Sequence, residues 1–115
     1  MGRIYKAKEG VTLLSYGQIT KVTLYVSSYI NNNLTAIIGE HEDGESFGSL
    51  TINLGKNFKE YGEFVTTIKD EYYEQLLEKN IIEEEISEII YGFNCKAHLC
   101  KINMSKFELK LDECN

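Results

Sequence analysis

The sequence predicts an α+β fold in which an antiparallel β-meander sheet of about five to seven strands has one main helix packed on one face. The first half of the chain supports this prediction because apolar and polar side chains alternate with a period of two, which is typical of half-buried antiparallel strands. Residues 70–79 support it because their apolar side chains recur at helical spacing. A chain of 115 residues has the length of one domain, so we expect residues 1–115 to form a single unit.

Composition narrows the class of protein. Hydrophobic residues make up 43% of the chain and charged residues 26%, a balance that allows a folded core. No apolar run has the roughly 20 residues that a membrane-spanning helix needs, and the first residues lack the apolar core of a signal peptide. The three cysteines, an odd number, then favour reduced thiols. We therefore expect a cytoplasmic protein that makes no contact with a membrane.

Residues 21–30 are the clearest predicted strand. Val22 and Leu24 fall on one face of this strand, whereas Thr23 and Tyr25 fall on the other. The run of asparagines that follows tolerates the backbone conformation of a tight turn, and a later Asp-Gly pair predicts a β-hairpin. Further strands are expected over residues 11–16, 34–40, 46–54 and 63–68.

The helix predicted over residues 70–79 has an apolar stripe formed by Tyr72, Tyr73, Leu76 and Leu77. Acidic residues in its first turn match the helix dipole, and the asparagine that follows its last turn favours a stop.

Periodicity leaves residues 81–93 open, because their isoleucines suit either a helix or a strand. The segments 97–102 and 106–111 are predicted as strands that complete the sheet. The side chains of the last strand that we expect to face the core are Phe107, Leu109 and Leu111.

Acidic side chains concentrate in one segment. The formal net charge is −6, and residues 70–88 hold eight acids against one base, Lys79. Proteins that grip nucleic-acid phosphates usually present a dense basic face, so we expect no direct contact with nucleic acid. The eight acids are Asp70, Glu71, Glu74, Glu78, Glu83, Glu84, Glu85 and Glu88.

Two interpretations of this acidic segment stay open. The segment is either a solvated helix face and loop, which is the usual meaning of a charge run, or an electronegative surface that binds a basic partner. Tyr25 and Tyr29 are further candidate partner-binding residues, because tyrosine is enriched at interfaces. The alternative for both tyrosines is a second packing layer against the helix.

Cys95, His98 and Cys100 lie close together in the sequence and are the first candidates for a metal site or a catalytic pair. A structural zinc site usually needs four ligands, and the remaining candidates, His41 and Cys114, are remote and unpaired. No nucleophile motif surrounds the cysteines. We therefore predict no metal, no cofactor and no catalytic residue, with a small enzyme that uses Cys100 and His98 as the alternative.

One stretch of the chain is similar to a known family. Residues 42–54 read Glu-Asp-Gly-Glu-Ser-Phe-Gly-Ser-Leu-Thr-Ile-Asn-Leu, and this stretch resembles a small domain-of-unknown-function family found on phages and conjugative elements of Gram-positive bacteria. The order of strand-like segments over about residues 20–110 follows the same pattern. The resemblance implies an accessory protein of a mobile genetic element, and it favours a strand over residues 86–91.

These observations predict a non-enzymatic accessory protein that acts by protein–protein binding. We expect its partner to be a host protein with a basic surface. A host defence nuclease is one such partner, which the acidic segment would inhibit by binding. A homodimeric structural module, formed through an exposed sheet edge, is a further alternative.

Overall fold

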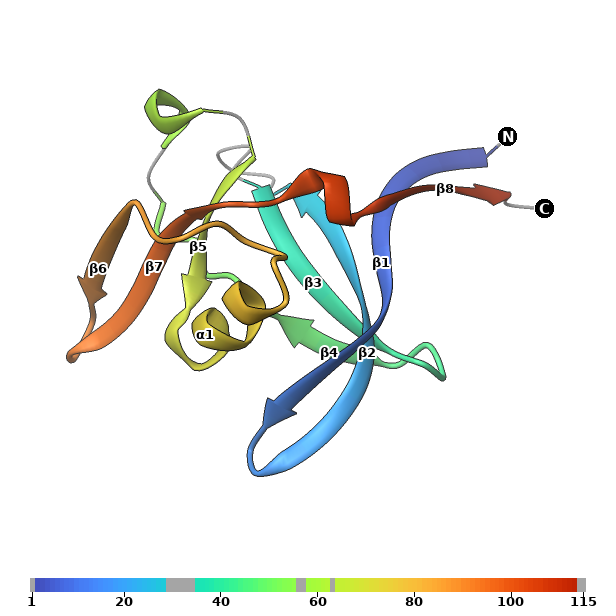
Figure 1. Cartoon of the computed structure of the whole chain (residues 1–115), viewed down its shortest axis with the longest axis horizontal. Coiled ribbons are helices and arrows are strands. Elements are labelled where there is room, and N and C mark those ends of the chain that lie inside the picture. The colour runs from blue at the N-terminus through green and yellow to red at the C-terminus, as the bar shows by residue number, and fades with distance from the viewer. Residues whose placement is uncertain (1, 29–34, 56–57, 63, 114–115) are drawn as a thin grey trace.

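A computed structural model shows two antiparallel β-sheets that share one α-helix (Figure 1). It describes residues 2–28, 35–55, 58–62 and 64–113. The elements are β1 (Gly2–Ser15), β2 (Gln18–Ser28), β3 (Thr35–His41), β4 (Ser46–Ser49), a 3-10 turn η1 (Lys59–Tyr61), β5 (Val65–Lys69), α1 (Asp70–Glu78), β6 (Ser87–Tyr91), β7 (Cys95–Lys101), a second 3-10 turn η2 (Met104–Lys106) and β8 (Glu108–Glu113). The predicted α+β class with antiparallel strands and one helix is confirmed, but the single predicted sheet is wrong.

The larger sheet has the strand order β4-β3-β2-β1-β8. Its first four strands follow one another as the predicted meander, and the first hairpin turns at Tyr16 and Gly17, both with positive φ. The predicted alternation of β2 is confirmed, because Val22 and Leu24 are fully buried whereas Thr23 is not. Strand β1 is longer than the predicted segment because its first half also pairs with β8.

The smaller sheet has the strand order β5-β7-β6 and settles the open segment 81–93. Asn80 adopts a positive φ of 58°, which ends the helix as predicted. The chain then returns alongside β7, where Glu83 N–H donates to the carbonyl of Lys101 over 2.9 Å. Residues 87–91 form a strand because β7 supplies backbone partners along its whole length. The strand that the resemblance favours over residues 86–91 is therefore confirmed, and the helical alternative is wrong.

The chain passes from one sheet to the other just after β4. Leu50 N–H donates to Ile37 of the larger sheet over 2.9 Å, while the Leu50 carbonyl accepts from Lys69 of the smaller sheet over 3.0 Å. Thr51 forms an isolated bridge with Ile68. The predicted strand over residues 46–54 is therefore too long, because its second half serves as the crossing between two sheets.

Helix α1 covers the junction between the sheets and completes the core. Tyr72 and Leu76 on its buried face contact a cluster that includes Leu24 of β2 and Ile68 of β5. The side-chain amide of Gln75 also bonds to the backbone of β1. Helix α1 has nine residues and is the one α-helix in the described part of the chain. A helix of this length is too short to cross a bilayer.

The last strand corrects one more prediction. Phe107 is buried, as expected, but the side chain of Leu109 is 66% exposed. Strand β8 pairs with the beginning of β1 in an arm that extends away from α1, so no layer of the main core lies over Leu109 (Figure 1). The side chain of Leu111 lies outside the described part of the molecule.

Replacing Leu76 with alanine is expected to lower the free energy of unfolding by about 2–5 kcal/mol, because the side chain is fully buried and its removal leaves a cavity. Exposed Glu78 on the same helix provides the control, and Glu78→Ala is expected to change stability by less than about 0.5 kcal/mol. Urea unfolding followed by circular dichroism measures both. Equal stabilities of the two variants would contradict the packing of α1 described here.

Candidate functional site

The acids of this segment lie on the exposed side of α1 and along residues 83–88, and we call them together the acidic surface. Its members are the eight acids Asp70, Glu71, Glu74, Glu78, Glu83, Glu84, Glu85 and Glu88. Because the buried stripe of α1 faces the core, Glu71, Glu74 and Glu78 are exposed.

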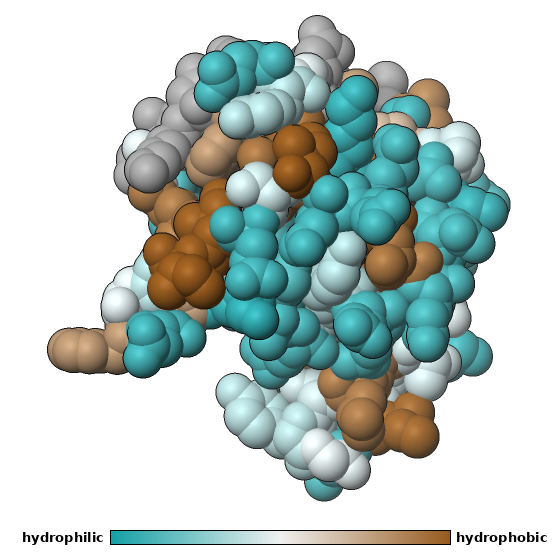
Figure 2. Space-filling view, turned by 60° about the vertical axis from the view of Figure 1, so that its left-hand side comes forward, coloured by the Kyte–Doolittle hydropathy of each residue, from teal (hydrophilic) through white to brown (hydrophobic). Residues whose placement is uncertain are grey.

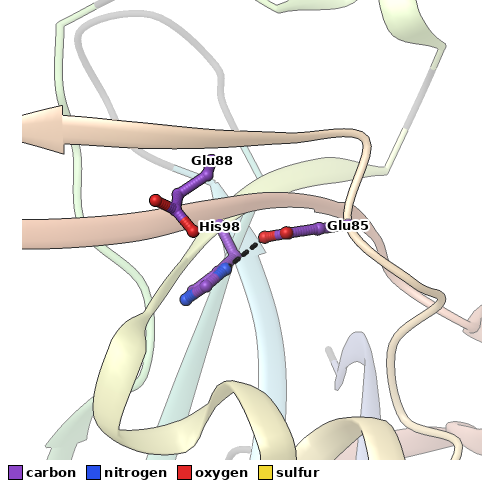
Figure 3. A group of neighbouring side chains, drawn as sticks. All are labelled: Glu85, Glu88 and His98. Carbon is purple, nitrogen blue, oxygen red and sulfur yellow. Dashed lines mark hydrogen bonds and ion pairs between the residues drawn. The ribbon is translucent and has the colours of Figure 1, made fainter.

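A buried histidine joins the two parts of the acidic surface. His98 projects from β7 toward α1 and is only 5% exposed. Its Nε2 lies 2.7 Å from Oδ1 of Asp70 in the first turn of α1. Its other ring nitrogen, Nδ1, bonds to Oε2 of Glu85 (Figure 3). The ring of Tyr73 stacks on the imidazole with a centroid distance of 4.0 Å and an interplanar angle of 11°. We call these four residues the His98 cluster.

The backbone holds Glu85 in position for this contact. The amide of Glu85 donates to the hydroxyl of Tyr73 over 3.0 Å, so the same tyrosine that covers His98 also anchors the loop. The next amide, that of Ile86, donates to the carbonyl of Leu99 over 2.7 Å and starts the run alongside β7. The loop from 83 to 86 is thereby tied to both the helix and the sheet.

The charges around His98 favour its protonated form. Burial, the largest single effect, lowers the pKa of His98, but the hydrogen bonds and negative charges of Glu85 and Asp70 together raise the pKa above its ordinary value. A protonated imidazole has two N–H donors, which match the two carboxylates that it contacts. When the imidazole is protonated, the cluster places a cation between two carboxyl groups.

Glu88 brings a third carboxylate close to this histidine. It lies opposite His98 across the β6–β7 pair, and one oxygen each of Glu85 and Glu88 and a ring nitrogen of His98 lie within 4.8 Å of one another (Figure 3). These are ligand types that divalent metals accept. Both ring nitrogens are already hydrogen-bonded, however, and Glu88 also lies 3.7 Å from Nζ of Lys96, so an ion would have to replace existing contacts.

Neither Cys95 nor Cys100, the two cysteines among the described residues, belongs to the group of possible metal ligands around His98. Cys95 is exposed at the start of β7, while Cys100 is fully buried and donates to the backbone carbonyl of His98. Burial, with a smaller effect from the charge of Glu85, raises the pKa of Cys100 to about 12. Little of the thiolate that a nucleophile requires is present at neutral pH.

The two candidate tyrosines lie away from the acidic surface or outside the described residues. Tyr25 projects from the face of β2 opposite to Leu24, which contacts the core beneath α1, and its hydroxyl lies 3.4 Å from a carboxylate oxygen of Glu40. Tyr25 therefore does not pack against the helix. Tyr29 lies outside the described residues.

Sequence reasoning missed the parts played by Tyr73 and His98. The sequence predicts Tyr73 as one member of an apolar helical stripe. In the structure its ring stacks on the imidazole of His98 and its hydroxyl accepts from the amide of Glu85. If β6 and β7 are taken to form a hairpin, the three-residue turn at 92–94 places Glu88 opposite His98. This pair can therefore be predicted from the sequence. The contact with Asp70 depends on how α1 sits on the sheet.

Comparison of the chain with protein-family models, with curated proteins and with solved structures gives no match.

Replacing His98 with glutamine is expected to flatten the dependence of stability on pH. Because the pKa of His98 is raised by folding, its contribution to wild-type stability is complete below about pH 6.5 and is lost as the pH rises through the folded-state pKa. Urea unfolding at a series of pH values from about 6 to 9 measures the slope. The variant His41→Gln, which leaves the His98 cluster intact, is the control, and an unchanged slope in His98→Gln would contradict this assignment.

Cys100 is expected to resist thiol reagents in the folded protein. In the double variant Cys95→Ser/Cys114→Ser, labelling by an aromatic disulfide reagent at about pH 8 should be limited by the rate of unfolding, because the remaining thiol is buried. The variant Cys100→Ser/Cys114→Ser keeps the exposed Cys95 and should react as a free thiol does. Fast labelling of Cys100 would instead favour the enzyme alternative.

Proposed function

We propose that this protein is a non-enzymatic accessory protein that binds a host protein with a basic surface through its acidic surface. The observation that carries the proposal is the His98 cluster, in which residues 13 and 28 positions away in the sequence reach the same histidine from opposite sides. The cluster ties α1 to the loop over residues 83–86, so the acids of both are held in a fixed arrangement. A negative face that is held rigidly in this way is suited to recognition by contact.

The charge of the acidic surface is only partly neutralised within the chain. Among the described residues, the ion pairs of this surface involve only His98 and Lys96. Exposed acids such as Glu74 and Glu84 therefore add to a negative potential that steers encounter with a positively charged partner. Contacts of this kind speed association and weaken as salt rises.

Inhibition of a host defence nuclease is the form of binding that these features support best. A nuclease offers a basic groove for nucleic-acid phosphates, and an acidic protein surface competes for that groove by charge. The resemblance of residues 42–54 to a family of phage and conjugative elements supports the same setting. An accessory protein of a mobile element that blocks a nuclease would need no catalytic residue of its own.

Reversing two charges of the acidic surface is expected to abolish capture of the partner from host lysate. The variant is Glu74→Lys/Glu84→Lys, which leaves Asp70 and Glu85 in place because both hold His98. The matched control is Glu42→Lys/Glu45→Lys on the β3–β4 turn, which makes the same change in net charge at the opposite side of the molecule (Figure 1). Retention of the partner by wild type and control, with its loss by the first variant, supports the proposal.

The captured protein is then purified, and its dissociation constant is measured by calorimetry at two salt concentrations. We expect affinity to fall by about tenfold or more in Glu74→Lys/Glu84→Lys, and to fall with salt for the wild type. Circular dichroism confirms that all the variants are folded. Equal affinity of the two double variants would reject the acidic surface as the binding site.

A further inference from the structure

The strand β6 lies at the edge of the smaller sheet. The strand order β5-β7-β6 leaves one side of β6 without a strand partner among the described residues, and Figure 1 shows β6 at the outer margin of the molecule. An edge strand presents backbone N–H and C=O groups that another chain can pair with. The five residues of β6 are enough for a short ladder of such hydrogen bonds.

Apolar side chains lie along this edge. Ile86 just before β6 is 43% exposed, Ile90 within it is 57% exposed, and Phe93 in the following turn is fully exposed. Figure 2, in which this side of the molecule comes forward, shows apolar patches bordered by hydrophilic residues. A single exposed isoleucine needs no explanation, but three large apolar side chains beside an open strand edge are typical of a binding site.

The acids of this region alternate with those apolar residues. Glu88 and Ile90 are two positions apart in β6, so they share one face of the strand. Residues 83–85, three consecutive glutamates, lead directly into the same edge. The edge therefore offers backbone groups, apolar contact and negative charge together.

We propose that the partner docks here by strand addition, as an extended segment with alternating basic and apolar side chains that pairs with β6. This inference rests on the proposed function and specifies how the acidic surface is used. Backbone hydrogen bonds supply affinity, while the basic side chains of the added strand lie on the face of β6 that carries Glu88 and Ile90, with their charged ends toward Glu84 and Glu88 and their aliphatic stems against Ile90. The apolar side chains of the added strand lie on the opposite face, beside Ile89. Lys96 neutralises Glu88 only in part, since the two groups are 3.7 Å apart and both side chains are partly exposed.

Charge decides against a second copy of this chain as the occupant. Residues 83–91 hold four acids and no base. Pairing two copies through β6 would bring both sets of acids to one seam, and like charges on neighbouring strands destabilise a pair. A basic segment removes that repulsion and gains ion pairs instead.

The test uses two synthetic peptides and isotope-labelled protein. The first peptide is about eight residues of alternating lysine and valine with blocked ends, and the second has the same sequence with its central backbone nitrogens methylated. Methylation removes the N–H donors and leaves the charge unchanged. We expect the first peptide to shift the amide resonances of β6 and to bind about tenfold or more tightly than the second.

Two matched protein variants locate the site. Ile90→Ser is expected to weaken binding of the first peptide several-fold, whereas Leu109→Ser, on the edge strand β8 of the other sheet, is expected to leave it unchanged. Both side chains are more than half exposed, so neither variant is expected to unfold the protein.

The remaining outcomes separate this inference from the proposed function. Equal affinity of the two peptides, weakened alike by Glu74→Lys/Glu84→Lys, would overturn strand addition and leave the acidic surface standing. Tighter binding of the first peptide than of the second, unchanged by Glu74→Lys/Glu84→Lys, would support backbone pairing with β6 but overturn the contact with Glu84 and count against the charge-based function. Failure of both peptides to bind, or concentration-dependent dimerisation with shifts in β6, would overturn a basic segment as the occupant.

Discussion

A buried, protonated histidine needs nearby carboxylates to balance its charge. In this protein that requirement fixes how α1 and the loop before β6 lie against the smaller sheet. His98 bonds to Asp70 from the start of α1 and to Glu85 from the loop before β6. Each of these contacts places a backbone segment as well as a side chain, because a buried cation without partners would be strongly unfavourable. Tyr73 closes the arrangement by stacking on the ring and holding the loop amide.

The His98 cluster has this effect because α1 lies where the two sheets meet. The crossing at residues 50–52 makes one backbone hydrogen bond to the larger sheet and two to the smaller sheet, so the two sheets are connected by backbone as well as by the shared core. Leu76 and Tyr72 fill the space between them. Apolar packing thus holds the buried face of the helix, and the His98 cluster holds its first turn. The other acids of the helix are exposed to solvent.

This arrangement separates what stabilises the fold from what is free to bind. The two carboxylates that contact His98 are engaged inside the protein, whereas Glu71, Glu74 and Glu84 remain on the surface. The open edge of β6 follows Glu84 closely in the chain and contributes backbone donors and acceptors. A partner that supplies positive charge and an extended backbone would satisfy both features at once, without any bond-making chemistry.

Local patterns along the chain determined much of this architecture. Short-range periodicity gives the alternation of Val22 and Leu24 and the helical stripe from Tyr72 to Leu77. The density of acids over residues 70–88 is visible in the sequence itself. Only the tertiary structure decided that two sheets form and that β6 is a strand, because both depend on backbone partners far away in the sequence. It also decided that Asp70 and Glu85 meet at His98, since side-chain spacing along one element says nothing about how a helix sits on a sheet.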